Sequence, residues 1–406
     1  MKPRNAMCLL LALACLFSGA GLTEVELATP APTPQPAAPE LSDAPLLDAP
    51  PIALDCAAAL LVEPESGQII FEQNADTPRA VASVTKIMTI LLALEAVQDG
   101  RIDLEDEVVV SEAAAGMGGS QVLLDVGEVQ PFSVLLKSAI VASANDASVA
   151  IAEALYGSEA AFVERMNERA QQLGMESTRF VNCTGLPAEG QQTTARDVAR
   201  MTIAMLRCPA YFDFSSIWLD EVDHGDGRIT QLTNTNKLIR LYEGCDGGKT
   251  GSTSEAGYCI SVTAMRADMR LAAIVLGAQT GTERFDIASE MLDYGFAHFR
   301  LYPVAERGTK VRGTLPVTGG DAQGVPLILD ADLTLLLQRG DENSVLLEPE
   351  LPQSIEAPVA AGQRVGSVDV TLDGRVVARI PVVTAQAVAA RGLKNALRRI
   401  LSFWEL

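Results

Sequence analysis

The sequence predicts an α/β (α+β) domain in which helices flank an antiparallel sheet, followed by a small all-β domain and a C-terminal amphipathic helix. Strand-like segments stand at both ends of a helical block between about residues 55 and 300. This order is typical of a domain whose sheet is assembled from distant segments. After about residue 302, short alternating runs are separated by Gly, Asp and Pro, as in small all-β domains. The last 20 residues are basic and amphipathic.

The N-terminal segment has the pattern of an export signal. In MKPRNAMCLLLALACLFSGAG, Lys2 and Arg4 precede a short apolar core and small residues. We expect residues 1–20 to be a secretory signal peptide, because the apolar core is short for a membrane span. Residues 21–52 are rich in Pro and Ala and are expected to be an extended linker. No later segment has the pattern of a transmembrane helix.

The first domain is expected to span residues 53–300. Gly and Pro positions divide it into apolar runs with either the period of a strand or the period of a helix. The expected elements are two strands in 56–74, a buried helix at 83–99, a helical stretch at 131–173 broken near Ser143 and Gly157, a helix at 193–208 capped by Thr193 or Thr194, a hairpin in 257–277 and a helix at 281–298.

The β-rich domain is expected to span residues 301–385, and the amphipathic helix residues 386–406. On a helical wheel the apolar residues of this helix cluster opposite the basic ones. The two sets are Leu393, Leu397, Ile400, Leu401 and Trp404, and Arg391, Lys394 and Arg398. A basic helix that ends in an aromatic residue predicts an anchor to the membrane surface. The alternative is a helix that packs on the β domain.

Composition limits the function classes. The chain has 52 acidic and 31 basic residues and a formal charge of −21, which argues against nucleic-acid binding. Five cysteines remain after removal of the signal peptide, widely scattered and without a CxxC pair. We therefore expect buried thiols, with no zinc site, other metal or cofactor.

The stretch ASVTKIMT at residues 82–89 places Lys86 three residues after Ser83 at the start of a helix, so the two share a face. The chain has only seven lysines against 24 arginines, so this position is informative. A lysine that has lost its charge through burial can take the proton of a serine. The alternative is a serine N-cap followed by a chance lysine.

Two further motifs supply what such a serine needs. Ser143 and Asn145, in SAN, lie at a break between helical stretches, where a loop can direct both side chains into a cleft. Lys249, in KTG, precedes an apolar strand and offers a second cation. A Ser-His-Asp triad is improbable, because the two histidines, His224 and His298, lie in a polar turn and late in an apolar helix.

In this order, SVTK, SAN and KTG resemble the motif set of penicillin-binding proteins and class A β-lactamases. SGQIIFEQNADTPRAVASVTKIMT, SANDAS, NTNKL, GGKTGSTSEAGYC and LDYGF resemble one subgroup, the serine-type D-alanyl-D-alanine carboxypeptidases, or low-molecular-mass penicillin-binding proteins. The resemblance covers residues 55–300 strongly and the β domain more loosely. It implies a penicillin-binding/β-lactamase-like transpeptidase fold and an exported enzyme at the outer face of the cytoplasmic membrane.

The resemblance also implies roles. Ser83 would attack the carbonyl between two D-alanines of a peptidoglycan stem peptide and form an acyl-enzyme that penicillin also forms. Lys86 would be the base for this step, and Ser143 would relay a proton to the leaving amine. Asn145 would hold the amide of the substrate.

A second group of residues would bind the substrate. Lys249 would add positive potential, and Thr250 and Arg284 would bind the terminal carboxylate. Gly251 would let the substrate approach the backbone, and the N–H groups of Ser83 and Ser252 would form an oxyanion hole.

The sequence departs from the family pattern at CTGL (183–186) and QQTT (191–194), which affects substrate preference and deacylation. Asn182 and Asp197 have either structural or catalytic roles, and Lys237 is expected to be structural.

Other functions stay open at this point. A β-lactamase needs a second base between the SAN and KTG motifs, where Glu176 and Glu189 lack the expected sequence setting. A D,D-endopeptidase and a β-lactam sensor that acylates without turnover share the same motifs.

Overall fold

The computed structural model describes residues 40–42, 44–225 and 227–392. The predicted signal peptide and residues 393–406 of the predicted anchor helix lie outside the described residues.

A five-stranded antiparallel sheet with the order β2-β1-β9-β8-β7 forms the centre of the first domain. Its strands are β1 (Ala58–Glu63), β2 (Gln68–Gln73), β7 (Cys245–Thr253), β8 (Gly257–Arg266) and β9 (Met269–Ala278). Leu60 of β1 is opposite Ile274 of β9, so strands from the two ends of the domain pair directly. This confirms the predicted assembly from distant segments. The strand that carries KTG, β7, is one of the two edge strands of the sheet.

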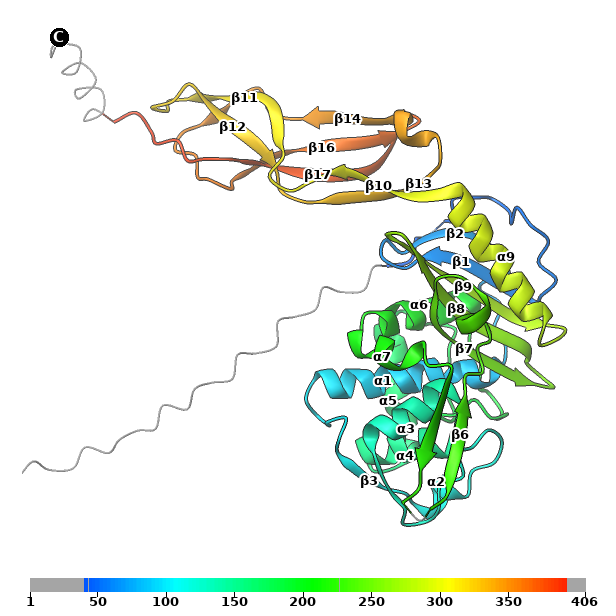
Figure 1. Cartoon of the computed structure of the whole chain (residues 1–406). Helices are drawn as coiled ribbons and strands as arrows, with labels where there is room; N and C mark the ends of the chain where they lie inside the picture. Colours follow the sequence, from blue (N-terminus) through cyan, green and yellow to red (C-terminus); the bar gives the residue numbers. More distant parts are fainter. Residues whose placement is uncertain (1–39, 43, 226, 393–406) are drawn as a thin grey trace, which may run out of the picture. The chain divides into compact units, whose positions relative to one another are not determined.

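Helices cover both faces of this sheet (Figure 1). Successive strand residues point to opposite faces. Leu60 belongs to the core formed with α1 (Lys86–Gln98) and α6 (Ala195–Leu206), and Leu61 to the core formed with α9 (Glu283–His298). The sheet is therefore buried on both sides, which fixes β7 relative to α1.

The helical block follows the predicted breaks. It consists of α3 (Phe132–Val141), α4 (Asn145–Tyr156) and α5 (Glu159–Gln172), with Gly157 in the left-handed region at φ 77°. The Thr194 side chain caps α6 by accepting a hydrogen bond from the Asp197 amide. The short elements are η1 (Ala82–Thr85), β3 (Glu107–Val109), α2 (Glu112–Ala115), β4 (Val129–Pro131), η2 (Pro209–Tyr211), α7 (Phe212–Ser215), β5 (Leu219–Asp223), β6 (Ile229–Thr233) and α8 (Leu238–Leu241).

The C-terminal domain is all-β, as predicted, with its own apolar core around Val325, Val370 and Val382. Its main sheet has the order β14-β16-β17-β12-β11-β15, and β10 pairs with β13. The elements are β10 (Phe299–Ala305), β11 (Lys310–Thr318), β12 (Gly324–Leu329), β13 (Leu333–Gln338), η3 (Asp341–Ser344), β14 (Val345–Glu350), β15 (Ile355–Glu356), β16 (Arg364–Leu372) and β17 (Arg375–Thr384).

The structure differs from the prediction at both ends of the described chain. Residues 386–392 are not helical, because Val388 is buried in the β-domain core and its backbone pairs with Val359. In the predicted linker, the amides of Leu46 and Leu47 donate to the carbonyls of Ile69 and Ile70 on β2. This part of the linker is therefore attached to the sheet. Among the described residues, no helix has the length and hydrophobicity to cross a bilayer.

Candidate active site

Ser83 lies in the 3₁₀ turn η1, immediately before α1. Ala82 has φ 49°, an uncommon value for a residue with a side chain. Two glycines let the chain approach this turn closely. A Cβ atom at Gly251 would lie 2.5 Å from the Val81 carbonyl oxygen, and one at Gly185 would lie 2.0 Å from the Ala82 carbonyl oxygen. Ser83 caps neither η1 nor α1, so the serine N-cap interpretation is wrong.

The buried amine of Lys86 has three oxygen neighbours. Its Nζ lies 3.1 Å from Ser83 Oγ, 2.5 Å from Asn145 Oδ1 and 2.7 Å from the Thr184 carbonyl oxygen. Burial lowers the pKa of Lys86 from 10.5 to about 7. A neutral amine has two N–H donors, which the Asn145 and Thr184 oxygens accept, and one lone pair, which is left to face the Ser83 hydroxyl. The pair is thus arranged for proton transfer from serine to lysine.

Ser143 and Lys249 form a second buried pair. Lys249 Nζ donates to Ser143 Oγ at 2.7 Å and to the Thr250 carbonyl oxygen at 3.0 Å. The pKa of Lys249 is well below its ordinary value, chiefly because of burial and also because of the positive charges of Lys86 and Arg284. Ser143 has φ 63°, in the left-handed region, which ends α3 and directs its hydroxyl toward Lys249.

Asn145, the first residue of α4, is held from two sides. Its Oδ1 accepts from Lys86, and its Nδ2 donates to the Gly118 carbonyl oxygen at 2.6 Å. Its backbone N–H donates to the Ser120 carbonyl oxygen at 2.7 Å. The next residue, Asp146, accepts hydrogen bonds from the Val122 amide. The segment after α2 is therefore fixed directly to the SAN motif.

The edge strand β7 brings the KTG motif alongside Ser83. Thr250 Oγ1 donates to Thr235 Oγ1 at 2.8 Å, next to the end of β6. A Cβ atom at Gly251 would lie 2.8 Å from the Ser83 nitrogen, so any side chain there would displace the turn. Ser252, the next residue, is exposed. The backbone of β7 and the Ser83 turn thus lie in close contact at Gly251.

Arg284 on α9 reaches the backbone of β7. Its Nη1 donates to the carbonyl oxygens of Gly251 at 3.1 Å and Cys259 at 3.3 Å. Its Nε is buried without a hydrogen-bond partner among the described residues. Burial lowers the pKa of the guanidinium. The structure thus brings Arg284 to the same strand as Lys249 and Thr250.

The loop at 182–186 contributes to the site through a carbonyl group. Thr184 accepts a hydrogen bond from Lys86 with its main-chain oxygen, which every residue type has. The sequence could therefore not predict this contact. Asn182 Oδ1 accepts from the Gly185 amide at 2.7 Å, and its Nδ2 donates to the Leu186 carbonyl oxygen at 2.9 Å. These contacts give Asn182 the structural role of shaping this loop.

The other residues considered from sequence lie outside this cluster. Asp197 accepts from the Thr178 hydroxyl and stands in the first turn of α6. Lys237, Glu176 and Glu189 are exposed. Neither glutamate is therefore in the buried setting that a second base beside Ser83 and Lys86 would need.

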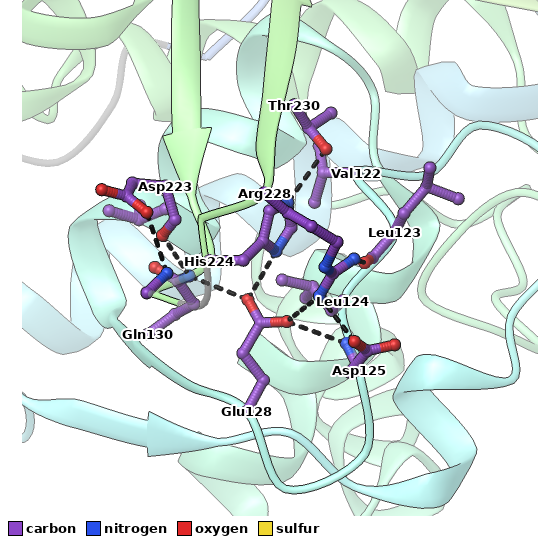
Figure 2. A network of polar contacts seen from close by, with 12 residues as sticks. Val122, Leu123, Leu124, Asp125, Glu128, Gln130, Asp223, His224, Arg228 and Thr230 are labelled. Carbon is purple, nitrogen blue, oxygen red and sulfur yellow. Dashed lines mark hydrogen bonds and ion pairs between the residues drawn. The ribbon is translucent and has the colours of Figure 1, made fainter.

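The side chain of His224, which lies in a polar turn, is buried and belongs to a network of polar contacts (Figure 2). Its Nδ1 lies 2.8 Å from Glu128 Oε1, and its Nε2 lies 2.9 Å from Thr230 Oγ1. Gln130 donates both to Glu128 Oε1 and to the Asp223 carbonyl oxygen, each at 2.8 Å. The loop before β4 is thereby connected to the β5–β6 hairpin.

Comparison with known proteins gives two family matches. The D-alanyl-D-alanine carboxypeptidase family matches residues 46–280. The C-terminal domain of penicillin-binding protein 5 matches residues 299–390.

Individual relatives cover most of the chain. A D-alanyl-D-alanine carboxypeptidase of Bacillus subtilis, DacF, is 37% identical over 87% of this chain and 91% of its own length. DacC of Escherichia coli is 33% identical over 84% of this chain and 86% of its own length. Penicillin-binding protein 5 of Haemophilus influenzae has a solved structure that is 30% identical, with a TM-score of 0.74, over 84% of this chain and 99% of that one.

Proposed function

The chain belongs to the D-alanyl-D-alanine carboxypeptidase family of serine peptidases, and on that premise we propose that Ser83 is its nucleophile. The chain is a serine D,D-carboxypeptidase with a role in the bacterial cell wall. In the proposed reaction, Ser83 Oγ attacks the carbonyl carbon of the penultimate D-alanine of a peptidoglycan stem peptide. An ester forms, the bond to the terminal D-alanine breaks, and water then hydrolyses the ester.

One observation carries this proposal: the 3.1 Å contact between Ser83 Oγ and the buried Nζ of Lys86. Because the pKa of Lys86 is about 7, much of the amine is neutral at physiological pH and can take the serine proton. Asn145 and Thr184 hold the amine in place. Lys86 is therefore proposed as the base for acylation.

The leaving D-alanine needs a proton on its nitrogen. Ser143 is proposed to deliver it, with its hydroxyl held by Lys249 at 2.7 Å. Asn145, whose side chain bonds Lys86, is proposed to bind the substrate amide. Burial lowers the pKa of Lys249, and the carboxylate of a bound substrate would favour its protonated, positively charged form.

The substrate is proposed to lie along β7. The N–H groups of Ser83 and Ser252 would hold the oxyanion, with Gly251 leaving room for the approach. Thr250 would bind the terminal carboxylate, with positive charge supplied by Lys249 and Arg284. The local positive charge opposes the formal charge of −21 carried by the whole chain.

The enzyme is proposed to be exported and attached to the outer face of the cytoplasmic membrane. The family acts on extracytoplasmic peptidoglycan, and the sequence of residues 386–406 retains the basic amphipathic pattern from Arg391 onward. Flotation of the mature chain with anionic lipid vesicles, compared with a chain ending at residue 392, tests the attachment. Equal flotation of both chains would contradict it.

The first test of the reaction is intact-mass spectrometry with benzylpenicillin, beside D-alanine release from diacetyl-lysyl-D-alanyl-D-alanine. We expect a penicillin adduct that is absent in Ser83→Ala, together with D-alanine release by the unmodified enzyme only. An adduct without D-alanine release would favour a non-turnover sensor, and rapid destruction of the drug would favour a β-lactamase. A stable adduct in Ser83→Ala would contradict the nucleophile assignment.

A further inference from the structure

A pocket of about 530 Å³ lies beside the end of β7 and contains Arg79. Its walls are residues 252–258, residues 277–279 and Ala57. The pocket begins at Ser252, whose amide is proposed to bind the oxyanion, and Arg79 precedes Ser83 by four residues. It is therefore adjacent to the reaction site along both segments of the chain.

The Arg79 guanidinium is held in place without a partner for its Nε. This nitrogen is buried and has no hydrogen bond among the described residues. The guanidinium lies against Gly277, where a Cβ atom would be 2.5 Å from Nη2 and 3.0 Å from Cζ. The backbone of Arg79 is fixed by two hydrogen bonds to Thr193. The backbone anchor and the small residue at 277 together hold the cation at the pocket wall.

Two other half-buried arginines of this acid-rich chain have carboxylate partners. Arg169 pairs with Glu95 at 2.7 Å and Arg196 with Glu72 at 2.7 Å. For Arg79, the described part of the chain supplies no carboxylate within ion-pair distance, although Glu255 lines the same pocket. A partly desolvated arginine without a carboxylate is suited to bind one from a ligand.

The proposed reaction fixes the direction from which a ligand enters. The terminal carboxylate of the substrate lies toward Thr250 and the reacting carbonyl toward Ser252. The residues that precede the D-alanine pair must then continue past Thr253, which lines the pocket. We propose, on the basis of the function above, that Arg79 binds a carboxylate in this upstream part of the acyl-donor peptide. The enzyme therefore prefers anionic donor peptides.

Two matched pairs of synthetic peptides test this. Ac-Glu-Lys(Ac)-D-Ala-D-Ala is compared with its Gln counterpart, and Ac-Ala-Glu-D-Ala-D-Ala with its Gln counterpart. For at least one pair we expect a preference for the Glu peptide on the order of fivefold in kcat/KM, mainly through KM, shrinking as salt is added. In Arg79→Gln the ratio should fall to about one, and Arg79→Lys should keep part of it.

A matched control is Arg307→Gln, an exposed arginine of the β domain that should keep the full preference. Thermal unfolding of each variant verifies that it folds. The proposal is overturned if the unmodified enzyme shows no charge preference in either pair, or if Arg79→Gln keeps the preference.

Measurements of peptide binding test the role of Arg79 independently of the proposed reaction. Dissociation constants of the four peptides are measured with Ser83→Ala and with Ser83→Ala combined with Arg79→Gln. Failure to release D-alanine from any peptide would count against the proposed function. The ratio of dissociation constants would still decide the role of Arg79, because it does not depend on turnover.

Discussion

Lys86 Nζ and the carbonyl oxygen of Thr184 lie 2.7 Å apart in the buried centre of the site. The contact joins α1 to a loop that is 98 residues further along the chain. Together with Asn145 Oδ1, this oxygen accounts for both N–H donors of a neutral lysine and leaves the lone pair for Ser83. These contacts orient the amine toward Ser83, and burial favours the neutral form that catalysis needs.

The pH dependence of acylation should follow Lys86. Its pKa is lowered to about 7, and the neutral form, which predominates above that value, is the base. The rate of acylation by benzylpenicillin should therefore rise from the acid side and level off above about pH 7, falling about tenfold per pH unit well below it. Stopped-flow measurement of the acylation rate constant tests this. A rate that does not change on the acid side would contradict the assignment of Lys86 as base.

Lys86→Arg should abolish acylation even though the positive charge is kept. Arginine does not lose its proton in proteins, so it cannot accept one from Ser83. We expect a loss of at least about 10²-fold in the acylation rate. Because the larger side chain could distort the core, Lys86→Met is measured as well, and circular dichroism checks the fold of both. Rapid acylation by either folded variant would show that another group is the base.

Arg284→Ala should impair turnover of peptide substrates. It removes two hydrogen bonds to the carbonyls of Gly251 and Cys259 and a positive charge near Lys249. Loss of that charge should raise the pKa of Lys249 and weaken binding of the terminal carboxylate. We expect kcat/KM for diacetyl-lysyl-D-alanyl-D-alanine to fall at least about tenfold, with partial recovery in Arg284→Lys. Unchanged peptide turnover would contradict the carboxylate assignment.

Gly251→Ala tests the close approach of β7 to the Ser83 turn. The added Cβ would lie 2.5 Å from the Val81 carbonyl oxygen and 2.8 Å from the Ser83 nitrogen. Since both are backbone atoms, the turn or the strand must move. We expect a loss of about 1–3 kcal/mol in the free energy of unfolding and a larger proportional loss of acylation.

The control for this prediction is Gly392→Ala, because a Cβ atom there would meet nothing within 4 Å and the position is far along the chain from the site. Denaturant unfolding and penicillin acylation are measured for both variants. If the two variants have the same stability and the same acylation rate, the close contact at Gly251 does not matter for stability or catalysis.

The sequence was sufficient to predict the elements that local patterns define. The break at Ser143 lies between two helical periodicities, and the assembly of the sheet from distant segments follows from strand signals at both ends of the helical block, whereas the pairing of β1 with β9 did not. Contacts made by main-chain atoms, such as the Thr184 carbonyl, carry no residue signature. The attachment of Leu46 to β2 depends on backbone groups of a distant strand, so the Pro/Ala composition of its segment could not reveal it.

The burial of His224 also depends on a contact with a distant segment, so the sequence could not reveal it. Its partner Glu128 is 96 residues away, and nothing in the EVDHGDGR segment indicates that contact. The contact between Glu128 and His224 joins two segments. One is the segment between α2 and β4, which holds Asn145, and the other is the β5–β6 hairpin, which ends shortly before Thr235, the partner of Thr250. The contact thus connects segments that support two different catalytic motifs.

His224→Gln and Glu128→Gln should therefore affect both stability and substrate binding. Each change removes or weakens a hydrogen bond between two buried side chains, so we expect about 1–3 kcal/mol of lost unfolding free energy per variant. The double variant should lose less than the sum of the two losses, because the first change already disrupts the contact that the second change would disrupt. Looser support of Asn145 and Thr250 should raise the KM for peptide more than it lowers kcat. Denaturant unfolding and steady-state kinetics measure these effects, with exposed Glu105→Gln as control.

The Glu128 carboxylate adds a pH test. Burial opposes its charge, but hydrogen bonds from the Asp125 amide, Gln130 and His224 outweigh this and lower its pKa. A carboxyl group with a lowered pKa contributes stability that is present above its unfolded-state pKa and is lost as the pH falls through the folded-state value. The difference in stability between the unmodified enzyme and Glu128→Gln should therefore be full at neutral pH and shrink below about pH 4.5, the ordinary value for Glu. A difference that stays constant through this acid range, or losses that add fully in the double variant, would show that the Glu128–His224 contact does not couple the two segments.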